Sequence, residues 1–265
     1  INQDALNNLM KRHHVTIRQQ FGLLDTINLL GYFGVRVPRY IQVFGFALGG
    51  HTAIVDRYPD RKKPAVRGYA LGGYTSQVNT MLAADPDLKQ YAVRYYAMGG
   101  HTSHVNAILR TDPDFKLKKD AVYGYALSTY SSQVNAMLGT NPGLKEFAVG
   151  GYAQGGHTSQ VNAMLATDPD LKKAAIAGYA LGRYMSQVNT MLATDPDFQL
   201  KEFAVRGYAK FRYTDHIRDL IVTERSIQKV TKLLSIIKPY YKNHVDAYHV
   251  LILQIADALD GGDHS

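Results

Sequence analysis

Histidine and carboxylate side chains at unique positions are the first candidates for chemistry in this 265-residue chain. They form three short groups, namely His13 with His14, Asp215 with His216, and His244 with Asp246 and His249. Two histidines five residues apart on a helix point to different faces, so the third group makes a poor metal site. Asp246 and His249 have the spacing of an ordinary surface pair. We therefore expect no metal ion and no catalytic acid–base pair here.

Catalytic sequence motifs are also missing from the chain. There is no HExxH and no GxSxG pattern, and the Gly-Gly pairs lie between predicted helices rather than in a phosphate-binding loop. The absence of cysteine excludes disulfides and thiolate metal ligands, and it fits a reducing compartment. We expect no enzymatic activity, no cofactor and no small-molecule substrate. An enzyme whose chemistry resides in one flank of the chain is the remaining alternative.

Other polar residues recur at fixed intervals, which favours a structural role because a reaction rarely needs five copies of one group. Five asparagines each follow a valine: Asn79, Asn106, Asn135, Asn162 and Asn189. We expect them to hydrogen-bond to backbone groups at helix ends of adjacent turns. Six tyrosines form a second series, Tyr69, Tyr96, Tyr125, Tyr152, Tyr179 and Tyr208. We expect this tyrosine ladder to pack between repeats with its hydroxyls at the edge.

These residues belong to a repeated sequence. GYALGGYTSQVNTMLAADPDLKQYAVR occupies 68–94, and partial copies lie at 44–55 and 207–217. Full copies of 27 or 29 residues begin at Tyr95, Gly124, Gly151 and Gly178. A fixed period of this size is the signature of a stacked array in which each unit buries its apolar face against its neighbours.

The pattern predicts two short helices in each repeat. Asp85 can cap the first helix, Pro86 stands where its missing N–H costs nothing, and Gly99 and Gly100 should end it. The second helix begins near Thr102 and carries apolar residues at helical spacing. Such short helices do not persist alone, so stacking must hold them.

Two residue-level expectations follow from the stacking of repeats. A glycine precedes every ladder tyrosine except Tyr96. Because glycine inside a helix costs ~1 kcal/mol relative to alanine, its recurrence predicts close backbone approach between adjacent repeats. We also expect Leu138, in the middle copy, to support the array more than Ile217 in the decayed last copy.

The segment GGHTSQVNAMLATDP at 155–169, with Ala153 four residues before His157 and Val161 four after it, resembles the helix pair of an ankyrin repeat. The chain lacks the T-P-L-H opening and the loop that builds the ankyrin β-finger, which explains a period shorter than about 33 residues. The resemblance implies a protein-binding array in which helices and Gly-Gly turns replace the fingers. Such arrays are frequent in eukaryotic adaptors and in proteins that intracellular bacteria deliver into hosts.

We expect an all-α fold, an α-solenoid in which short helix pairs form a right-handed superhelix. Residues 1–43 form an N-terminal helical cap, 44–217 the array, and 218–265 a C-terminal helical hairpin cap. The alternative is that one flank is a small functional domain. No apolar run approaches the ~18 residues needed to span a bilayer, and no basic-then-apolar leader opens the sequence. We expect a soluble protein that is cytoplasmic or delivered into a host cytosol.

The expected function is a protein-binding scaffold or adaptor, with a bacterial effector as one form of it. Exposed residues that depart from the repeat consensus are the best candidates for the contact. On two adjacent turns they are Arg183, Tyr184, Lys210, Phe211, Arg212 and Tyr213. Basic and aromatic side chains are enriched in interface hot spots, although drift near a terminal cap would give the same departures. The turn histidines His101 and His157 are the next candidates.

A basic nucleic-acid-binding solenoid is the alternative function, because the formal net charge is +8. The lysines and arginines are spread along the chain, and lysines of successive first helices have aspartates nearby, as is typical of a solvated surface. A repeat-per-base code needs systematic variation at one reading position. The turn position alternates only between histidine and tyrosine, so we expect a protein partner.

Overall fold

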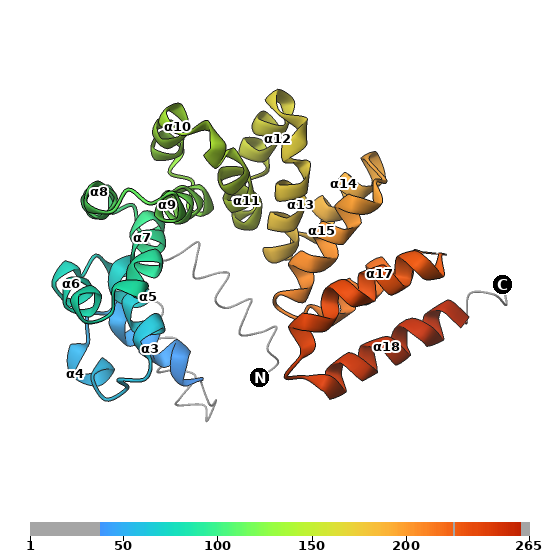
Figure 1. Cartoon of the computed structure of the whole chain (residues 1–265), viewed down its shortest axis with the longest axis horizontal. Helices are drawn as coiled ribbons and strands as arrows, with labels where there is room; N and C mark the ends of the chain where they lie inside the picture. The colour runs from blue at the N-terminus through green and yellow to red at the C-terminus, as the bar shows by residue number, and fades with distance from the viewer. Residues whose placement is uncertain (1–37, 225, 261–265) are drawn as a thin grey trace. The chain divides into compact units, whose positions relative to one another are not determined.

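The computed structural model describes residues 38–224 and 226–260, which form α-helices and short 3₁₀ helices with no strand among them (Figure 1). The chain divides into two compact units, Ile1–Gln133 and Val134–Ser265, whose boundary falls inside helix α10 (Ser131–Thr140). Within each unit, helix pairs stack on their neighbours along the chain. The predicted all-α class and the solenoid type of stacking are confirmed.

In the first unit, the first helices of successive repeats stack side by side, and each is followed by a shorter or equal second helix (Figure 1). The first helices are α3 (Arg39–Leu48), α5 (Lys62–Gly72), α7 (Lys89–Met98) and α9 (Phe115–Leu127). The second helices are α4 (Thr52–Val55), α6 (Thr75–Ala84) and α8 (Thr102–Thr111). A 3₁₀ turn, η1 (Pro86–Leu88), precedes α7.

The second unit has the same plan. Its first helices are α11 (Lys145–Gly155), α13 (Lys172–Leu181) and α15 (Phe198–Ala209), with the 3₁₀ turns η2 (Pro142–Leu144) and η3 (Pro169–Leu171) before α11 and α13. Its second helices after α10 are α12 (Thr158–Thr167), α14 (Met185–Thr194) and α16 (Thr214–Ile221). The chain continues through α17 (Ile227–Ile237), η4 (Lys238–Tyr241) and α18 (Val245–Asp260). Helix α17 packs on α15, and α18 packs on α16.

The start of the first helix differs between short and long copies of the repeat. In the short copies a 3₁₀ turn at an Asp-Pro or Asn-Pro motif leads into the α-helix, and Asp85 makes no capping hydrogen bond. In the long copies the Asp114 carboxylate accepts a hydrogen bond from the backbone N–H of Lys116 at 2.9 Å. Asp197 caps α15 in the same way. Asp85 therefore occupies the predicted N-cap position, before Pro86, but without the expected side-chain hydrogen bond. Among the described first helices, the long copies have that bond.

The second helices from α6 to α14 contribute little to the core. Five of them bury one valine completely: Val78, Val105, Val134, Val161 and Val188. The following leucines remain half-buried, as at Leu138. Ile217 takes the valine position in the last copy and is also completely buried. Burial therefore favours the opposite order from the one expected for Leu138 and Ile217, because the decayed copy keeps its core residue.

The tyrosine ladder and the helical glycines form the contact between stacked first helices. All six ladder tyrosines are at most 3% exposed. Five of their hydroxyls are buried, so the expectation that the hydroxyls lie at the edge is wrong. A methyl group added to Gly178 would overlap the carbonyl oxygen of Gly150 and lie 2.8 Å from the Cβ of Ala153 in the preceding repeat. One added to Gly68 would overlap the carbonyl oxygen of Phe44. The predicted close backbone approach is confirmed.

The repeated asparagines do not behave as expected. All five are exposed on the second helices, and none makes a side-chain hydrogen bond within the described residues. The prediction that they satisfy backbone groups at helix ends is wrong. Threonine hydroxyls hydrogen-bond to backbone carbonyl groups at the ends of the second helices instead. The Thr111 hydroxyl, for example, donates to the carbonyl oxygen of Ile108 at 2.9 Å.

Several expectations concern parts of the chain at its two ends. Most of the predicted cap at 1–43, with His13 and His14, lies outside the described residues. At the other end, Tyr241 is buried, and its hydroxyl lies 3.3 Å from that of Thr214 in the last repeat. None of the helices in the described ranges is long and apolar enough to cross a bilayer.

Candidate interaction site

The turn between the two helices of a repeat requires a left-handed residue. Glycine supplies it at Gly50, Gly73, Gly100 and Gly156, where φ lies between 73° and 79°. The first helix ends at this residue, and a histidine or tyrosine follows it as the N-cap of the second helix. Glycine adopts such a conformation without steric cost.

The ring that follows each turn covers the turn of the preceding repeat. A methyl group on Gly50 would lie 2.7 Å from the ring of Tyr74, and one on Gly73 would lie 2.8 Å from the ring of His101. The His101 Nε2 atom lies 3.0 Å from the carbonyl oxygen of Leu71. The Tyr184 hydroxyl donates to the carbonyl oxygen of Gly155 at 3.0 Å.

The alternation of histidine and tyrosine now has a physical explanation. Both side chains are planar rings with a polar atom that reaches a carbonyl oxygen left unpaired at a helix C-terminus. His101 and Tyr184 therefore stabilise contacts between repeats. His101 belongs to the first unit and His157 to the second.

Three turns have a residue other than glycine at the left-handed position. They are Thr129 with φ 62°, Arg183 with φ 62° and Arg212 with φ 54°. A left-handed conformation costs a residue with a Cβ atom about 1–2 kcal/mol. The two arginines therefore occupy positions at which glycine would be more stable.

The candidate contact residues are those that depart from the repeat consensus. Most of them lie close to Arg183 and Arg212 in the structure. The Arg183 guanidinium lies 4.7 Å from the ring centre of Tyr213 in the next turn. The ring centres of Phe211 and Tyr213 are 5.8 Å apart. Phe211 is 50% exposed, and Lys210 and Arg212 are also exposed. We call Arg183, Lys210, Phe211, Arg212 and Tyr213 the turn patch; Tyr184 faces the preceding turn instead.

The charges of the turn patch act on two buried tyrosines. Burial raises the pKa of Tyr208, and the Arg183 guanidinium lowers it in part. Burial likewise raises the pKa of Tyr241, which the Thr214 hydroxyl and the Arg212 guanidinium lower in part. Both arginines therefore lie within electrostatic reach of the stacked core; Arg212 is exposed and Arg183 is half-buried.

Lysines elsewhere in the array are paired with carboxylates of the next repeat. The Nζ atom of Lys89 lies 2.7 Å from Asp112, and that of Lys172 lies 2.7 Å from Asp195. Weaker pairs of the same kind join Lys62 to Asp85 at 4.0 Å and Lys145 to Asp168 at 3.5 Å. A hydrogen bond from the lysine is the main cause that lowers the pKa of Asp112 and of Asp195. The constant separation of 23 residues between partners is a sequence signal for these pairs.

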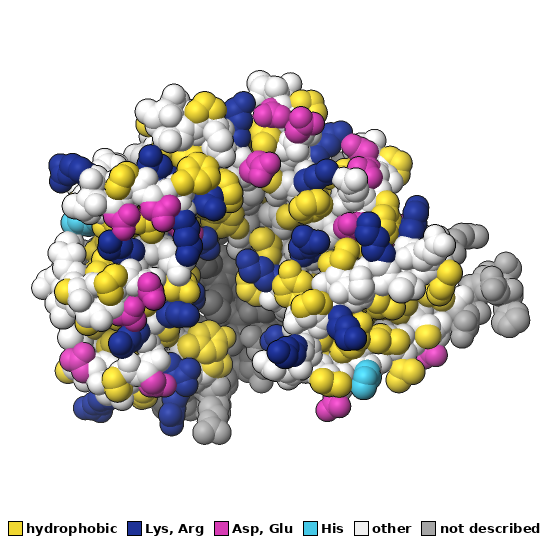
Figure 2. Space-filling view, in the orientation of Figure 1, with side chains coloured by type: hydrophobic (Ala, Val, Ile, Leu, Met, Phe, Trp, Pro, Cys, Tyr) yellow, Lys and Arg dark blue, Asp and Glu magenta, His cyan; other side chains and the backbone are white. Residues whose placement is uncertain are grey.

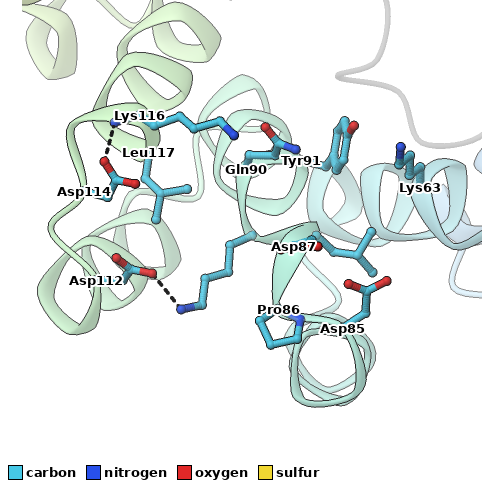
Figure 3. Close-up of a pocket in the computed structure, with 12 residues that line it drawn as sticks. Lys63, Asp85, Pro86, Asp87, Gln90, Tyr91, Asp112, Asp114, Lys116 and Leu117 are labelled. Atoms are coloured by element: carbon cyan, nitrogen blue, oxygen red, sulfur yellow. Dashed lines mark hydrogen bonds and ion pairs between the residues drawn. The ribbon is translucent and has the colours of Figure 1, made fainter.

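One such pair borders a polar hollow of about 530 Å³ in the first unit, between η1 and the start of α9 (Figure 3). Its lining mixes aspartates and lysines with Gln90 and Tyr91. Figure 3 shows Lys116 and Asp114 joined at the N-cap of α9, on the opposite side from Lys63. Because the charges of both signs serve helix ends and repeat contacts, the hollow fits a structural role.

A further set of contacts was not expected from the sequence. The Arg67 guanidinium lies 4.7 Å from the ring centre of Tyr91, and that of Arg94 lies 5.0 Å from the ring centre of Tyr123. Arg94 also forms an ion pair with Asp120. The sequence pattern that could have predicted these contacts is an arginine at the end of one repeat followed by an aromatic residue in the first helix of the next. These cation–π contacts stabilise stacking.

The remaining chemical candidates form no site in the part of the chain that is described. His244, Asp246 and His249 are exposed, and no three metal-ligating side chains cluster there. The ring of His216 packs 5.1 Å from that of Tyr208. On the face shown in Figure 2, basic and acidic side chains are intermingled rather than separated by sign.

No protein-family model matches the chain, and comparisons with curated proteins and with solved structures also find no match. The geometry of the turn patch is therefore the main indication of function.

Proposed function

We propose that the protein is an α-solenoid scaffold, ankyrin-like in its helix pairs, that binds a protein partner through the turn patch. The observation that carries the proposal is the left-handed conformation of Arg183 and Arg212. Four other turns use glycine at this position, so the fold does not require arginine. Strain that the fold does not require supports a functional role, because glycine offers a less strained alternative at the same position.

The composition of the turn patch agrees with this role. Arginine and aromatic side chains contribute a large share of the binding energy in protein interfaces. Phe211 is a large hydrophobic side chain that is half exposed beside two cations, Lys210 and Arg212. We further propose that the protein acts in a cytosol, its own or that of a host, because a chain without cysteine does not depend on oxidation.

The test uses affinity capture from a lysate with the full chain and with two sets of glycine variants. The double variant Arg183→Gly and Arg212→Gly restores the residue that other turns use, so it should fold and yet lose the partner. Thr129→Gly is the matched control, because it relieves the same conformation at a turn without a basic side chain, and it should keep the partner.

Capture is repeated at two salt concentrations and after nuclease treatment. A protein recovered under all conditions by wild type and by Thr129→Gly, but not by the double variant, supports the proposal. Equal recovery by the double variant contradicts the proposed site. Recovery that disappears after nuclease treatment would favour the alternative of a nucleic-acid-binding solenoid.

A further inference from the structure

We propose that the turn patch recognises a short acidic segment of its protein partner, with an apolar side chain next to the carboxylates. This inference rests on the proposed function and adds the chemistry of the partner. Arg183, Lys210 and Arg212 would bind the carboxylates, and Phe211 would pack against the apolar side chain.

The first argument for an acidic partner is the charge of the turn patch. Neither Lys210 nor Arg212 has a carboxylate within 4.0 Å among the described residues, whereas lysines of the array pair with the next repeat. The two aspartates that follow in α16 are only partly neutralised by Arg218, which lies 3.5 Å from Asp215 and 2.8 Å from Asp219. The turn patch therefore has an excess of positive charge, which an acidic segment complements.

The second argument is the geometry of the Arg183 side chain. Its guanidinium is stacked at 4.7 Å on the ring of Tyr213, and its backbone is held at φ 62°. Stacking engages the flat face of a guanidinium, whereas a carboxylate binds to the N–H groups at its edge. A side chain that is ordered before binding loses less conformational entropy when the partner arrives.

The neighbouring residues limit the length and class of the ligand. Side chains of Asp215 and Asp219 are 76% and 46% exposed, so they repel an anionic chain that extends beyond the turn patch. A nucleic acid has a charge at every phosphate and requires a longer basic surface. A peptide needs only two or three adjacent carboxylates and can place an apolar residue on Phe211, which is 50% exposed.

The experiment measures fluorescence anisotropy of short labelled probes with the full chain. The first probe is a peptide with three adjacent Asp or Glu residues followed by Leu and Phe. The second replaces each carboxylate by its amide, and the third is a single-stranded oligothymidylate of similar length. The acidic peptide should bind, and raising the salt concentration should weaken it.

The variants tested for the proposed function are used here too. Arg183→Gly with Arg212→Gly should weaken binding of the acidic peptide at least about tenfold, which corresponds to ~1.4 kcal/mol. Phe211→Ala should weaken it by a smaller factor, and Thr129→Gly should leave it unchanged. Equal binding of the amide peptide, an equal effect of Thr129→Gly, or tighter binding of the oligothymidylate would overturn the inference.

The two proposals fail in different ways. If lysate capture depends on the arginines but the acidic peptide does not bind, the partner chemistry is wrong and the scaffold function stands. If capture does not depend on the arginines, the proposed site is wrong whatever the peptide does.

Discussion

At the scale of single residues, the left-handed turn position distinguishes residues that the fold requires from residues that it does not require. Glycine there lets the ring of the next repeat close over the turn, as Tyr74 does over Gly50. Arg183 instead extends over the ring of Tyr213. The same backbone position therefore lets a ring pack on glycine in one turn and on an arginine side chain in another.

Replacing Thr129 and Arg183 by glycine should separate the free-energy cost of backbone strain from the stabilisation by ring stacking. We expect Thr129→Gly to raise the free energy of unfolding by about 1 kcal/mol, because φ is 62° and threonine is β-branched. Arg183→Gly should raise it less, since the cation–π contact with Tyr213 is worth about 0.5–1 kcal/mol at an exposed site. Urea unfolding followed by circular dichroism measures both; a loss of stability in Thr129→Gly would show that the turn is not strained.

Two tyrosine hydroxyls provide a second comparison between similar residues. The Tyr208 hydroxyl is buried without a hydrogen-bond partner in the described structure, whereas that of Tyr241 lies 3.3 Å from the Thr214 hydroxyl. An unsatisfied buried polar group costs about 1–3 kcal/mol. Tyr208→Phe should therefore be neutral or stabilising, and Tyr241→Phe should destabilise by about 1 kcal/mol. Chemical denaturation of both variants checks this, and the opposite order would contradict it.

At the scale of helices, the stacking distance is set by glycine and alanine on the first helices. Gly178 and Ala153 meet in adjacent repeats, and a Cβ atom at Gly178 would have no room. The helix accepts the lower propensity of glycine because tertiary contact requires the space. Second helices have no such contact, so their small residues are exposed and free of this restriction.

A pair of Gly→Ala substitutions tests this difference between helices. Gly139 lies in α10 with nothing within 4 Å of an added Cβ, so Gly139→Ala should stabilise the protein by up to about 1 kcal/mol. Gly178→Ala should destabilise it, because the methyl group meets backbone and Ala153. Thermal melts of the two variants give the measurement. A similar rise in melting temperature in both variants would mean that the stacked first helices can move apart at little cost in free energy.

At the scale of the whole molecule, the sequence predicts features that recur and misses those that join one repeat to the next. The repeat, the all-α class, the valine core and the tyrosine ladder follow from local spacing. The asparagine prediction failed because spacing alone does not tell which face of the second helix is exposed. Ring closure over the glycine turn and the pairing of Lys89 with Asp112 involve neighbours more than 20 residues apart. The departures from the consensus pointed to the residues of the turn patch. The left-handed conformation of its arginines could be recognised only from the backbone angles of the structure.

The ladder of buried tyrosines predicts how stability depends on pH. Burial raises the pKa of Tyr96, Tyr125, Tyr179 and Tyr208 above the ordinary value of 10.0. A raised pKa in the folded state stabilises the protein fully below pH 10, and this contribution is lost as the pH rises toward the folded value.

The free energy of unfolding should therefore change little between about pH 7 and 9 and fall steeply above pH 10. Each tyrosine adds up to ~1.4 kcal/mol per pH unit to this slope, because the unfolded chain has already lost the proton that the folded chain keeps. Urea unfolding at about pH 8, 10 and 11 measures the slope, and Tyr208→Phe should reduce it by the contribution of one proton. Equal stability at pH 8 and 11 would show that the hydroxyls are not held away from water, and it would contradict the stacked arrangement of the first helices.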